Sequence, residues 1–439
     1  MRRNTLVALV VWVISLVAAL STGRDLLFNT LYLITIVLAA SFAWSWLNIN
    51  RVGLSRYTRA RRSQVGRLAE EQFEVVNRSR LPKLWLEIRD HSTLPGHHPS
   101  RVVASLGGRK THAWYVRTPC YRRGRYLLGP LTVRSGDPLG IFELSRTLPQ
   151  TNTILVYPAT VDVHGFRLPE GQMPGGEAAR TRTHYLTTNV STVRDYAPGD
   201  SFNRIHWRST ARKGQLIVKE FELDPTSDVW ILLDLEAVWH AALPWQAPDE
   251  QDRPAVLWSE RLSVLSDGLS VLSERSTRFD LIPATIEYAV TAAASLARRY
   301  LMERRAVGLI AYPGHREIIQ PDRGERQLNK ILETLAVLQP TGSLAFDRFL
   351  AAESSFLGRT STVIAITPST DRAWVTGMRE IGRRGARGTA ILVAADSFGG
   401  ASRHERTLAE LWANNIPSYL LRHGLAIGDA LSQYARPGE

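Results

Sequence analysis

Two long apolar runs at the start of the chain constrain everything that follows them. The first covers residues 5–20 and the second covers residues 26–47. A bilayer core requires about 20 apolar residues per helix, so each run can span a membrane together with its flanking residues. Since only residues 21–25 separate the runs, we predict an antiparallel transmembrane helical hairpin in residues 1–50, with helices at about 5–22 and 26–47.

Basic residues flank this hairpin on one side only. Arg2 and Arg3 precede it, residues 51–67 contain six arginines and no acidic residue, and the short connection has only Arg24 beside Asp25. The positive-inside rule then predicts a plasma-membrane protein whose two termini and soluble domains are cytoplasmic. Residues 51–64 are predicted to be a basic juxtamembrane segment that contacts anionic lipid. The alternative is a cleaved signal peptide, with the second run as an anchor and the soluble part outside.

Length and composition indicate two soluble domains behind the hairpin. The chain has 439 residues, of which 44% are hydrophobic and 22% are charged. Cys120 is the single cysteine, which excludes an internal disulfide and a cysteine-based metal cluster. The net charge of +13 suits an anionic membrane face or nucleic acid. Because basic stripes with interleaved aromatics are missing outside the juxtamembrane segment and residues 193–222, we predict no nucleic-acid partner.

Residues 65–160 contain about seven short runs rich in β-branched and aromatic residues, separated by turn signals. This spacing is typical of a small β-sandwich. Asp137 precedes a proline and follows a glycine, a combination that predicts a turn. His97 and His98 lie in a loop without a second pair of metal ligands nearby, so we predict no metal there.

From residue 225 to 439 strand and helix patterns alternate, which predicts a mostly parallel, Rossmann-like α/β sheet covered by helices on both faces. In such a sheet ligands bind beyond the carboxyl ends of the strands, where Asp234, Asp371 and Asp396 are expected. Residues 237–280 form an insertion after the first strand. They either cover the sheet as a lid or, through Trp239 and Trp245, bind a partner. An amphipathic helix is expected around Trp258.

Residues 161–224 are predicted to be the linker and joint between the two soluble domains, and their most distinctive part is residues 193–222. Pro198 and Gly199 predict a turn, Asp200 a helix cap, and Gly214 the end of a helix or turn, before a strand at residues 215–221. The residues proposed to carry this stretch are Arg194, Asp195, Tyr196, Pro198, Gly199, Asp200, Arg204, Trp207, Arg212, Lys219 and Glu220.

Three interpretations of this stretch remain open. The charged and aromatic side chains are either a structural network of ion pairs and stacked rings, or a docking surface for a partner. The third is catalytic, with His206 as a base oriented by Asp195 or Asp200, although no nucleophile is marked.

The run RDYAPGDSFNRIHWRSTARKGQLIVKEFE, from Arg194 to Glu222, resembles the signature of the bacterial family named domain of unknown function 58. A second run, RGRYLLGPLTVRSGDPLGIF from Arg123 to Phe142, is similar to the other recurring block of that family. The resemblance implies a membrane-anchored protein that ends in a von Willebrand factor type A-like domain. It also implies a partner, a MoxR-type AAA+ ATPase, but no biochemical activity.

The first strand of the α/β region, which ends in LLDLE, resembles the first strand of a type A domain. Such domains often hold a divalent cation through an Asp-x-Ser-x-Ser pattern, but here both serines are missing. Asp234, Glu236 and Asp371 are the candidate metal ligands, with Thr367 as a further oxygen. Since magnesium requires near-ideal octahedral geometry, we favour Asp234 as a structural residue and predict no cofactor.

The sequence contains no phosphate-binding loop, dinucleotide fingerprint, nucleophile elbow or zinc-protease motif. We therefore predict a non-enzymatic, membrane-anchored interaction or scaffold protein that works with a MoxR-type ATPase in protein maturation or complex assembly. No small-molecule substrate is evident. The alternative is a divalent-metal-dependent ligand binder that uses the degenerate type A site.

Overall fold

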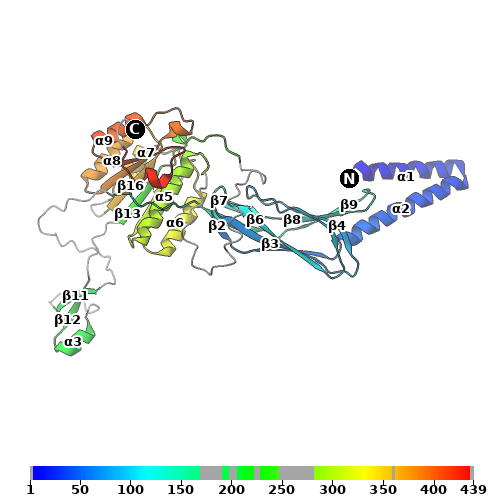
Figure 1. The fold of residues 1–439 in the computed structure, drawn as a ribbon, viewed down its shortest axis with the longest axis horizontal. Helices are drawn as coiled ribbons and strands as arrows, with labels where there is room; N and C mark the ends of the chain where they lie inside the picture. The colour runs from blue at the N-terminus through cyan, green and yellow to red at the C-terminus, as the bar shows by residue number, and fades with distance from the viewer. Residues whose placement is uncertain are drawn as a thin grey trace.

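The computed structural model describes residues 3–168, 190–196, 205–221, 228–246, 281–357 and 361–435, with residues 190–194 and 219–221 described by their backbone only. These residues form a helical hairpin, a β-rich domain, a mixed sheet with helices, and a small separate unit that contains the signature (Figure 1).

The N-terminal hairpin consists of α1 (Arg3–Thr22) and α2 (Asp25–Ile49). Gly23 lies in the turn between them with φ of +66°, a conformation that glycine adopts without steric cost. Both helices are long and apolar enough to cross a membrane, and their apolar side chains are mostly exposed. The prediction of two apolar N-terminal helices is confirmed.

The β-rich domain is built from three small sheets. One sheet has the antiparallel order β1 (Val52–Thr58), β3 (Leu68–Asn77) and β6 (Thr111–Pro119). The opposing sheet has the order β5 (Arg101–Leu106), β4 (Lys83–Asp90), β8 (Leu131–Gly136) and β9 (Glu143–Leu148). The third has the order β2 (Arg62–Gln64), β10 (Asn152–Tyr157) and β7 (Gly124–Leu128).

The core of this domain is filled from both larger sheets, as a β-sandwich requires. Phe73 and Val75 of β3 pack in one cluster with Leu86 and Ile88 of β4. Residues 51–64, which we predicted as a separate juxtamembrane segment, instead contain β1 and β2. The reason is that Val52 and Leu54 alternate with more exposed residues and so supply one face of the core.

The α/β domain has a six-stranded sheet with the order β15 (Glu317–Asp322), β14 (Val307–Ala311), β13 (Asp228–Leu233), β16 (Ser361–Thr367), β17 (Arg387–Val393) and β18 (Ser418–Leu421). All neighbouring strands are parallel except β15, which pairs antiparallel with β14. The chain passes from β13 to β14 on one side and later to β16 on the other, so the strand order reverses beside β13.

Apolar clusters cover both faces of this sheet, which explains why its central strands are apolar throughout. One face packs against α5 (Thr285–Met302), α6 (Glu325–Val337) and the short α10 (Ile427–Ala430). The other packs against α7 (Phe346–Glu353), α8 (Ala373–Arg383) and α9 (Glu405–Ala413). The predicted alternation of strands and helices is present, but the sequence analysis did not anticipate β15, α7 or α10.

The signature forms its own small unit. β11 (Val190–Asp195) pairs antiparallel with β12 (Ile217–Phe221), and α3 (Trp207–Lys213) lies between them in the chain. Ile205, Ile217 and Val218 are buried in the unit. Figure 1 draws this unit apart from the sandwich and the α/β domain.

Candidate functional site

Two capping residues define the start and the end of α3 in the signature unit. The ring of His206 accepts a hydrogen bond from the backbone N–H of Ser209, 3.3 Å from Nδ1, at the start of α3. Gly214 ends the helix with φ of +71°, and its N–H donates to the carbonyl of Thr210. The predicted role of Gly214 as the end of a helix is confirmed. His206 therefore caps the start of α3 through its ring Nδ1.

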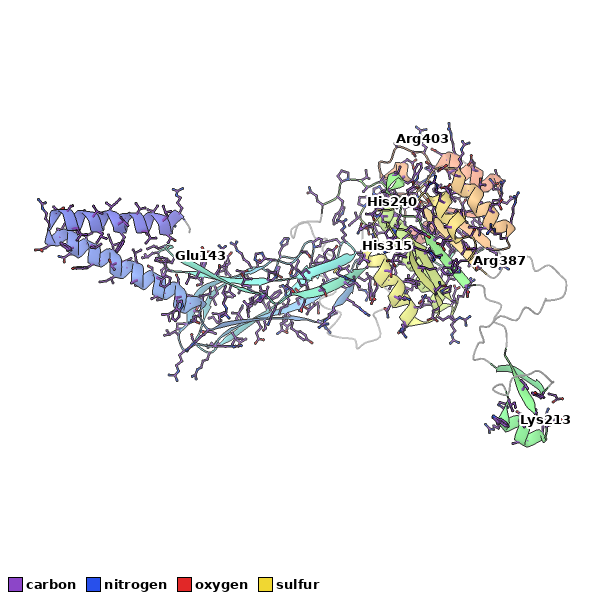
Figure 2. The ribbon with its side chains drawn as sticks, turned by 180° about the vertical axis from the view of Figure 1, so that it is seen from behind. Glu143, Lys213, His240, His315, Arg387 and Arg403 are labelled. Carbon is purple, nitrogen blue, oxygen red and sulfur yellow. The ribbon has the colours of Figure 1, made fainter. Side chains whose placement is uncertain are left out.

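The outward side chains of this unit are the part of the signature that the structure brings to the surface. None of the seven residues of α3 is buried, and Trp207 is 66% exposed. Arg208, Arg212 and Lys213 are exposed beside it, and Figure 2 labels Lys213 on this helix. About two turns of helix therefore present an indole and three cations to solvent.

The remaining signature residues fall into three groups. Asp195 is exposed and its Oδ1 accepts from the Gln215 amide at 3.1 Å, and the backbone N–H of Tyr196 donates to Leu216. Arg194, Lys219 and Glu220 are placed on β11 and β12 by their backbone. Outside the described residues lie Pro198, Gly199, Asp200 and Arg204, as does the helix expected around Trp258.

The second candidate site is at the carboxyl end of β13. Asp234 is buried, and its two carboxylate oxygens accept hydrogen bonds from the Glu236 N–H at 2.9 Å and the Thr367 hydroxyl at 2.5 Å. Burial raises the pKa of Asp234 from its ordinary value of 3.8 to about 7. Because Thr367 ends the neighbouring strand β16, the contact lies where the strand order reverses.

The loop after β16 continues this hydrogen-bonded chain. The Thr367 hydroxyl accepts from the Ser369 N–H at 2.9 Å, and the Ser369 hydroxyl accepts from the Asp371 N–H at 3.2 Å. The Asp371 carboxylate accepts from the N–H of Ala373, the first residue of α8. The carboxylate of Glu236 accepts from the indole of Trp239 at 3.1 Å.

These three carboxylates fit a divalent cation poorly. Each already has a protein donor, and the Asp234 carboxyl is partly neutral at pH 7. Among the described residues, the groups of three whose ligand atoms lie within 4.8 Å of one another are Glu71 with Asp90 and His97, and Asp396 with His404 and Glu405. The trio of Asp234, Glu236 and Asp371 is not one of them.

An arginine side chain contacts each of these clusters, and the sequence analysis did not predict either contact. Arg56 of β1 contacts Asp90 and Glu71, and His97 Nε2 lies 3.0 Å from Asp90 and 3.2 Å from Glu71. In the other cluster, Arg422 lies 3.1 Å from the Nε2 of His404. A guanidinium already supplies positive charge in each place, so we interpret each cluster as an ion network within its own domain.

His240, labelled in Figure 2, is a residue that the sequence analysis missed. Its Nε2 lies 3.1 Å from the carbonyl of Asp234 and its Nδ1 lies 3.0 Å from the hydroxyl of Thr285. Burial lowers the pKa of His240 to about 4, so the ring is neutral at pH 7. Since a carbonyl only accepts, Nε2 carries the proton and pins the segment after β13 to the start of α5.

The contact between the sandwich and the α/β domain is made by a buried arginine from the second recurring block. The Arg123 side chain is fully buried, and it donates to the carbonyls of Leu335 at 3.0 Å and Leu338 at 2.7 Å, at the end of α6. It also pairs with Glu287 in the first turn of α5. Arg62 adds a more exposed ion pair to Glu333 at 2.6 Å.

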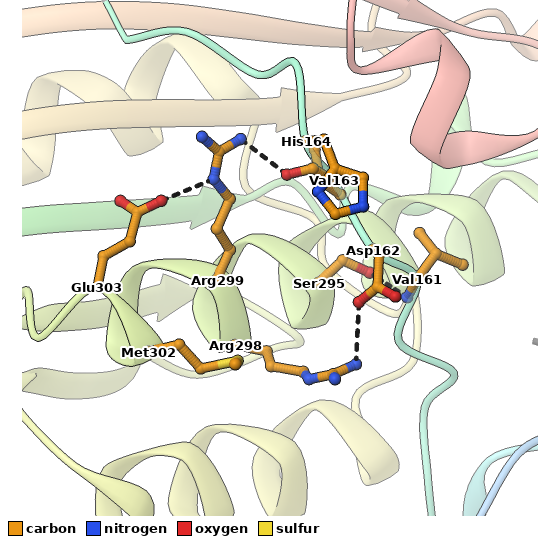
Figure 3. A pocket seen from close by; sticks show the side chains of 9 residues that line it. All are labelled: Val161, Asp162, Val163, His164, Ser295, Arg298, Arg299, Met302 and Glu303. Carbon is orange, nitrogen blue, oxygen red and sulfur yellow. Dashed lines mark hydrogen bonds and ion pairs between the residues drawn. The ribbon is translucent and has the colours of Figure 1, made fainter. Parts of the chain in front are cut away.

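Figure 3 shows a hollow of about 310 Å³ beside α5. The arginine side chains that line this hollow pair with other groups of the protein. Arg299 donates to the carbonyl of Val163 at 2.8 Å and pairs with Glu303 at 2.9 Å, and Arg298 lies 3.6 Å from Asp162. The hollow therefore offers few unmatched groups to a ligand.

Residues 192–240 match the family described as "Protein of unknown function DUF58". The chain is also 31% identical over 113 residues to the "Uncharacterized protein YeaD" of Bacillus subtilis strain 168. That alignment covers 26% of this chain and 28% of YeaD, so it spans less than a third of the relative. The signature region of this chain is therefore similar to the DUF58 family.

Two solved structures are among those similar to parts of the chain. The conserved hypothetical protein BatB from Bacteroides thetaiotaomicron is 14% identical over 47% of this chain and 96% of its own, with a TM-score of 0.30. A CARDB domain from Pyrococcus furiosus, solved in complex with di-metal ions, is 16% identical over 24% of this chain and 91% of its own, with a TM-score of 0.19. At these TM-scores neither likeness carries an argument.

Proposed function

We propose that this protein is a membrane-anchored, cytoplasm-facing scaffold without enzymatic activity, and that its signature unit docks a protein partner. The observation that carries the proposal is the exposure of α3, where Trp207 is 66% exposed and no residue of the helix is buried. Tryptophan and arginine are the residue types that dominate binding energy at protein interfaces. A helix that served only as cement between domains would bury such side chains.

Anchoring by α1 and α2 is supported by their length and apolar surface. The cytoplasmic orientation rests on the distribution of arginines around the hairpin. Protease added to intact spheroplasts should leave a C-terminal tag uncut and should remove it after lysis. Cleavage of the tag in intact spheroplasts would place the soluble domains outside.

We also propose that the C-terminal domain has the type A arrangement that the family resemblance implies. In support, the sheet has one antiparallel edge strand, β15, and its strand order reverses beside β13. The partner that the resemblance implies is a MoxR-type AAA+ ATPase, and the basic, aromatic face of α3 suits an acidic surface on such a partner. The scaffold would then present a client or complex to the ATPase.

The test is capture of partners from gently solubilised membranes by the full chain and by a Trp207→Ala variant. A matched control is Trp412→Ala, because Trp412 is 60% exposed on α9 of the α/β domain. We expect the wild type and Trp412→Ala to retain an AAA+ ATPase and Trp207→Ala to lose it, with all three melting alike. If the wild type captures no ATPase, the proposal of a MoxR-type partner is wrong. If Trp207→Ala still captures it, the docking surface lies elsewhere.

A further inference from the structure

The loop between β8 and β9, residues 137–142, is packed between the two helices of the hairpin. We name it the wedge loop. The Thr5 hydroxyl of α1 donates to the carbonyl of Ile141 at 2.5 Å, and the Ser45 hydroxyl of α2 donates to the carbonyl of Phe142 at 3.1 Å. The rings of Phe42 and Phe142 meet edge to face, 5.6 Å apart. Figure 2 labels Glu143, the residue that follows the loop, beside the open end of the hairpin.

The contacts on α2 lie well inside the apolar helix. Ser45 and Phe42 precede the end of α2 at Ile49 by four and seven residues, which is about 6 Å and about 10 Å along the helix axis. Trp44 and Trp46 lie at the same level and are 41% and 50% exposed. Tryptophans of spanning helices gather at the headgroup level, so the wedge loop reaches at least that depth.

Several backbone polar groups of the wedge loop are paired within the protein. The Asp137 carboxylate accepts from the N–H groups of Leu139 at 3.0 Å and Phe142 at 2.6 Å, and the Gly140 N–H donates to the Asp137 carbonyl at 3.1 Å. Pro138 has no N–H. The Gly140 carbonyl accepts from Asn4 at 3.2 Å, as those of Ile141 and Phe142 do from Thr5 and Ser45. Irregular backbone tolerates the membrane only when its polar groups are paired in this way.

The helix α2 carries polar residues where the sandwich docks on it. Ser41, Ser45 and Asn48 are buried and share one face, while most of the helix is apolar and exposed. The Asn48 side chain exchanges two hydrogen bonds with the backbone of Leu84 in β4, at 3.2 and 3.3 Å. These hydrogen bonds explain why Ser45 and Asn48 are buried in a helix otherwise suited to lipid.

The outer surface of the wedge loop is apolar. Leu139 at its tip is 63% exposed, and Trp85, which lies against Gly136 at the base of the loop, is 44% exposed. We propose that the wedge loop is a third membrane-contacting element, inserted into the bilayer interface with Leu139 against lipid. This inference rests on the proposed anchoring by α1 and α2. Its consequence is that the sandwich is held rigidly against the membrane and does not swing freely beneath it.

The experiment measures how deeply Leu139 lies in lipid. The full chain with Cys120→Ala and Leu139→Cys is labelled with a nitroxide in phosphatidylethanolamine–phosphatidylglycerol vesicles. Collision rates with oxygen and with a water-soluble nickel complex are then compared. Ile36→Cys, at the middle of α2 and 66% exposed, is the lipid reference. Leu127→Cys, on β7 and 41% exposed, is the water reference.

We expect the oxygen-to-nickel ratio at Leu139 to rise well above that at Leu127, toward the value at Ile36. A ratio equal to that at Leu127, with a high ratio at Ile36, overturns the wedge and leaves the anchor intact. Low collision rates with both reagents at Leu139 overturn it in favour of contact with protein. An oxygen-to-nickel ratio at Ile36 equal to that at Leu127 overturns the proposed anchoring by α1 and α2. It also overturns the insertion of the wedge loop, which rests on that anchoring.

Discussion

The two stretches that carry the family resemblance are used in opposite ways. The block from Arg123 to Phe142 bonds to other parts of the molecule at both of its ends, where the buried Arg123 side chain contacts the α/β domain and the wedge loop contacts the helical hairpin. The signature instead places α3 at the surface with no residue buried. The first therefore joins parts of the molecule, whereas the second presents exposed side chains, which we propose bind a partner.

Arg123→Met should have the largest effect. It leaves Glu287 and two carbonyls of α6 without their partner, and breaking a buried pair costs about 3–5 kcal/mol. Urea unfolding of the detergent-solubilised chain measures this loss. The control is Arg125→Met, because Arg125 lies two residues further along the chain and is exposed on β7. Equal losses of unfolding free energy in the two variants would mean that Arg123 does not join the sandwich to the α/β domain.

The second test varies the pH and concerns Asp234 at the carboxyl end of β13. The folded pKa of Asp234 is about 7 against an ordinary value of 3.8, so the folded state holds its proton more tightly. This contribution is fully present below about pH 4 and is lost as the pH rises through 7, a change on the order of 2–4 kcal/mol. Asp234→Asn should remove this pH dependence and should unfold at higher urea than wild type at pH 8.

The same two proteins test the cation site. Because the donors fit a cation poorly, millimolar magnesium at pH 8 should leave both unfolding midpoints unchanged. A rise in the wild type that is absent in Asp234→Asn would establish the metal-dependent alternative.

Asp137→Ala should have a smaller effect, because it leaves the N–H groups of Leu139 and Phe142 unpaired at a cost of about 1–3 kcal/mol. Thermal melting in lipid nanodiscs measures this loss. Asp137→Asn keeps one acceptor oxygen and should retain part of the stability. If Asp137→Ala melts like wild type, the wedge loop contributes nothing to the joint with the hairpin.

Trp207→Ala should have the smallest effect on stability, within about 0.5 kcal/mol, because exposed positions tolerate substitution. Its effect on partner capture should nevertheless be complete. A melting temperature far below that of Trp412→Ala would show that the indole is part of the unit's own structure, and the contrast between the two stretches would disappear.

Much of the local structure was predictable from residue patterns. The apolar runs predicted the hairpin helices, and Gly214 predicted where α3 ends, because only a few residue types adopt its left-handed conformation. The pattern of short runs predicted the sandwich, yet it missed β1, because Arg51 and the arginines after it suggested a membrane-facing segment. In β1 the side chains of Val52 and Leu54 face the core, and the one arginine of the strand, Arg56, itself has a buried side chain.

The roles of charged residues were the part that patterns could not give. His97 sits in a loop with no ligand pair nearby in sequence, and the fold brings Arg56, Glu71 and Asp90 to it from three strands. Glu71 has a lowered pKa because hydrogen bonding to His97 and the charge of Arg56 outweigh its burial.

The sequence by itself determined the apolar helices, the strand and helix order, and the caps, because these depend on residues within a few positions of one another. Only the tertiary structure decided which stretch is a joint and which is a surface. Arg123 reaches carbonyls more than 200 residues further along the chain, and Thr5 reaches Ile141 across 136 residues. Such pairs are selected by the packing of whole domains, where a buried charge or carbonyl must find its partner, and no local pattern records that choice.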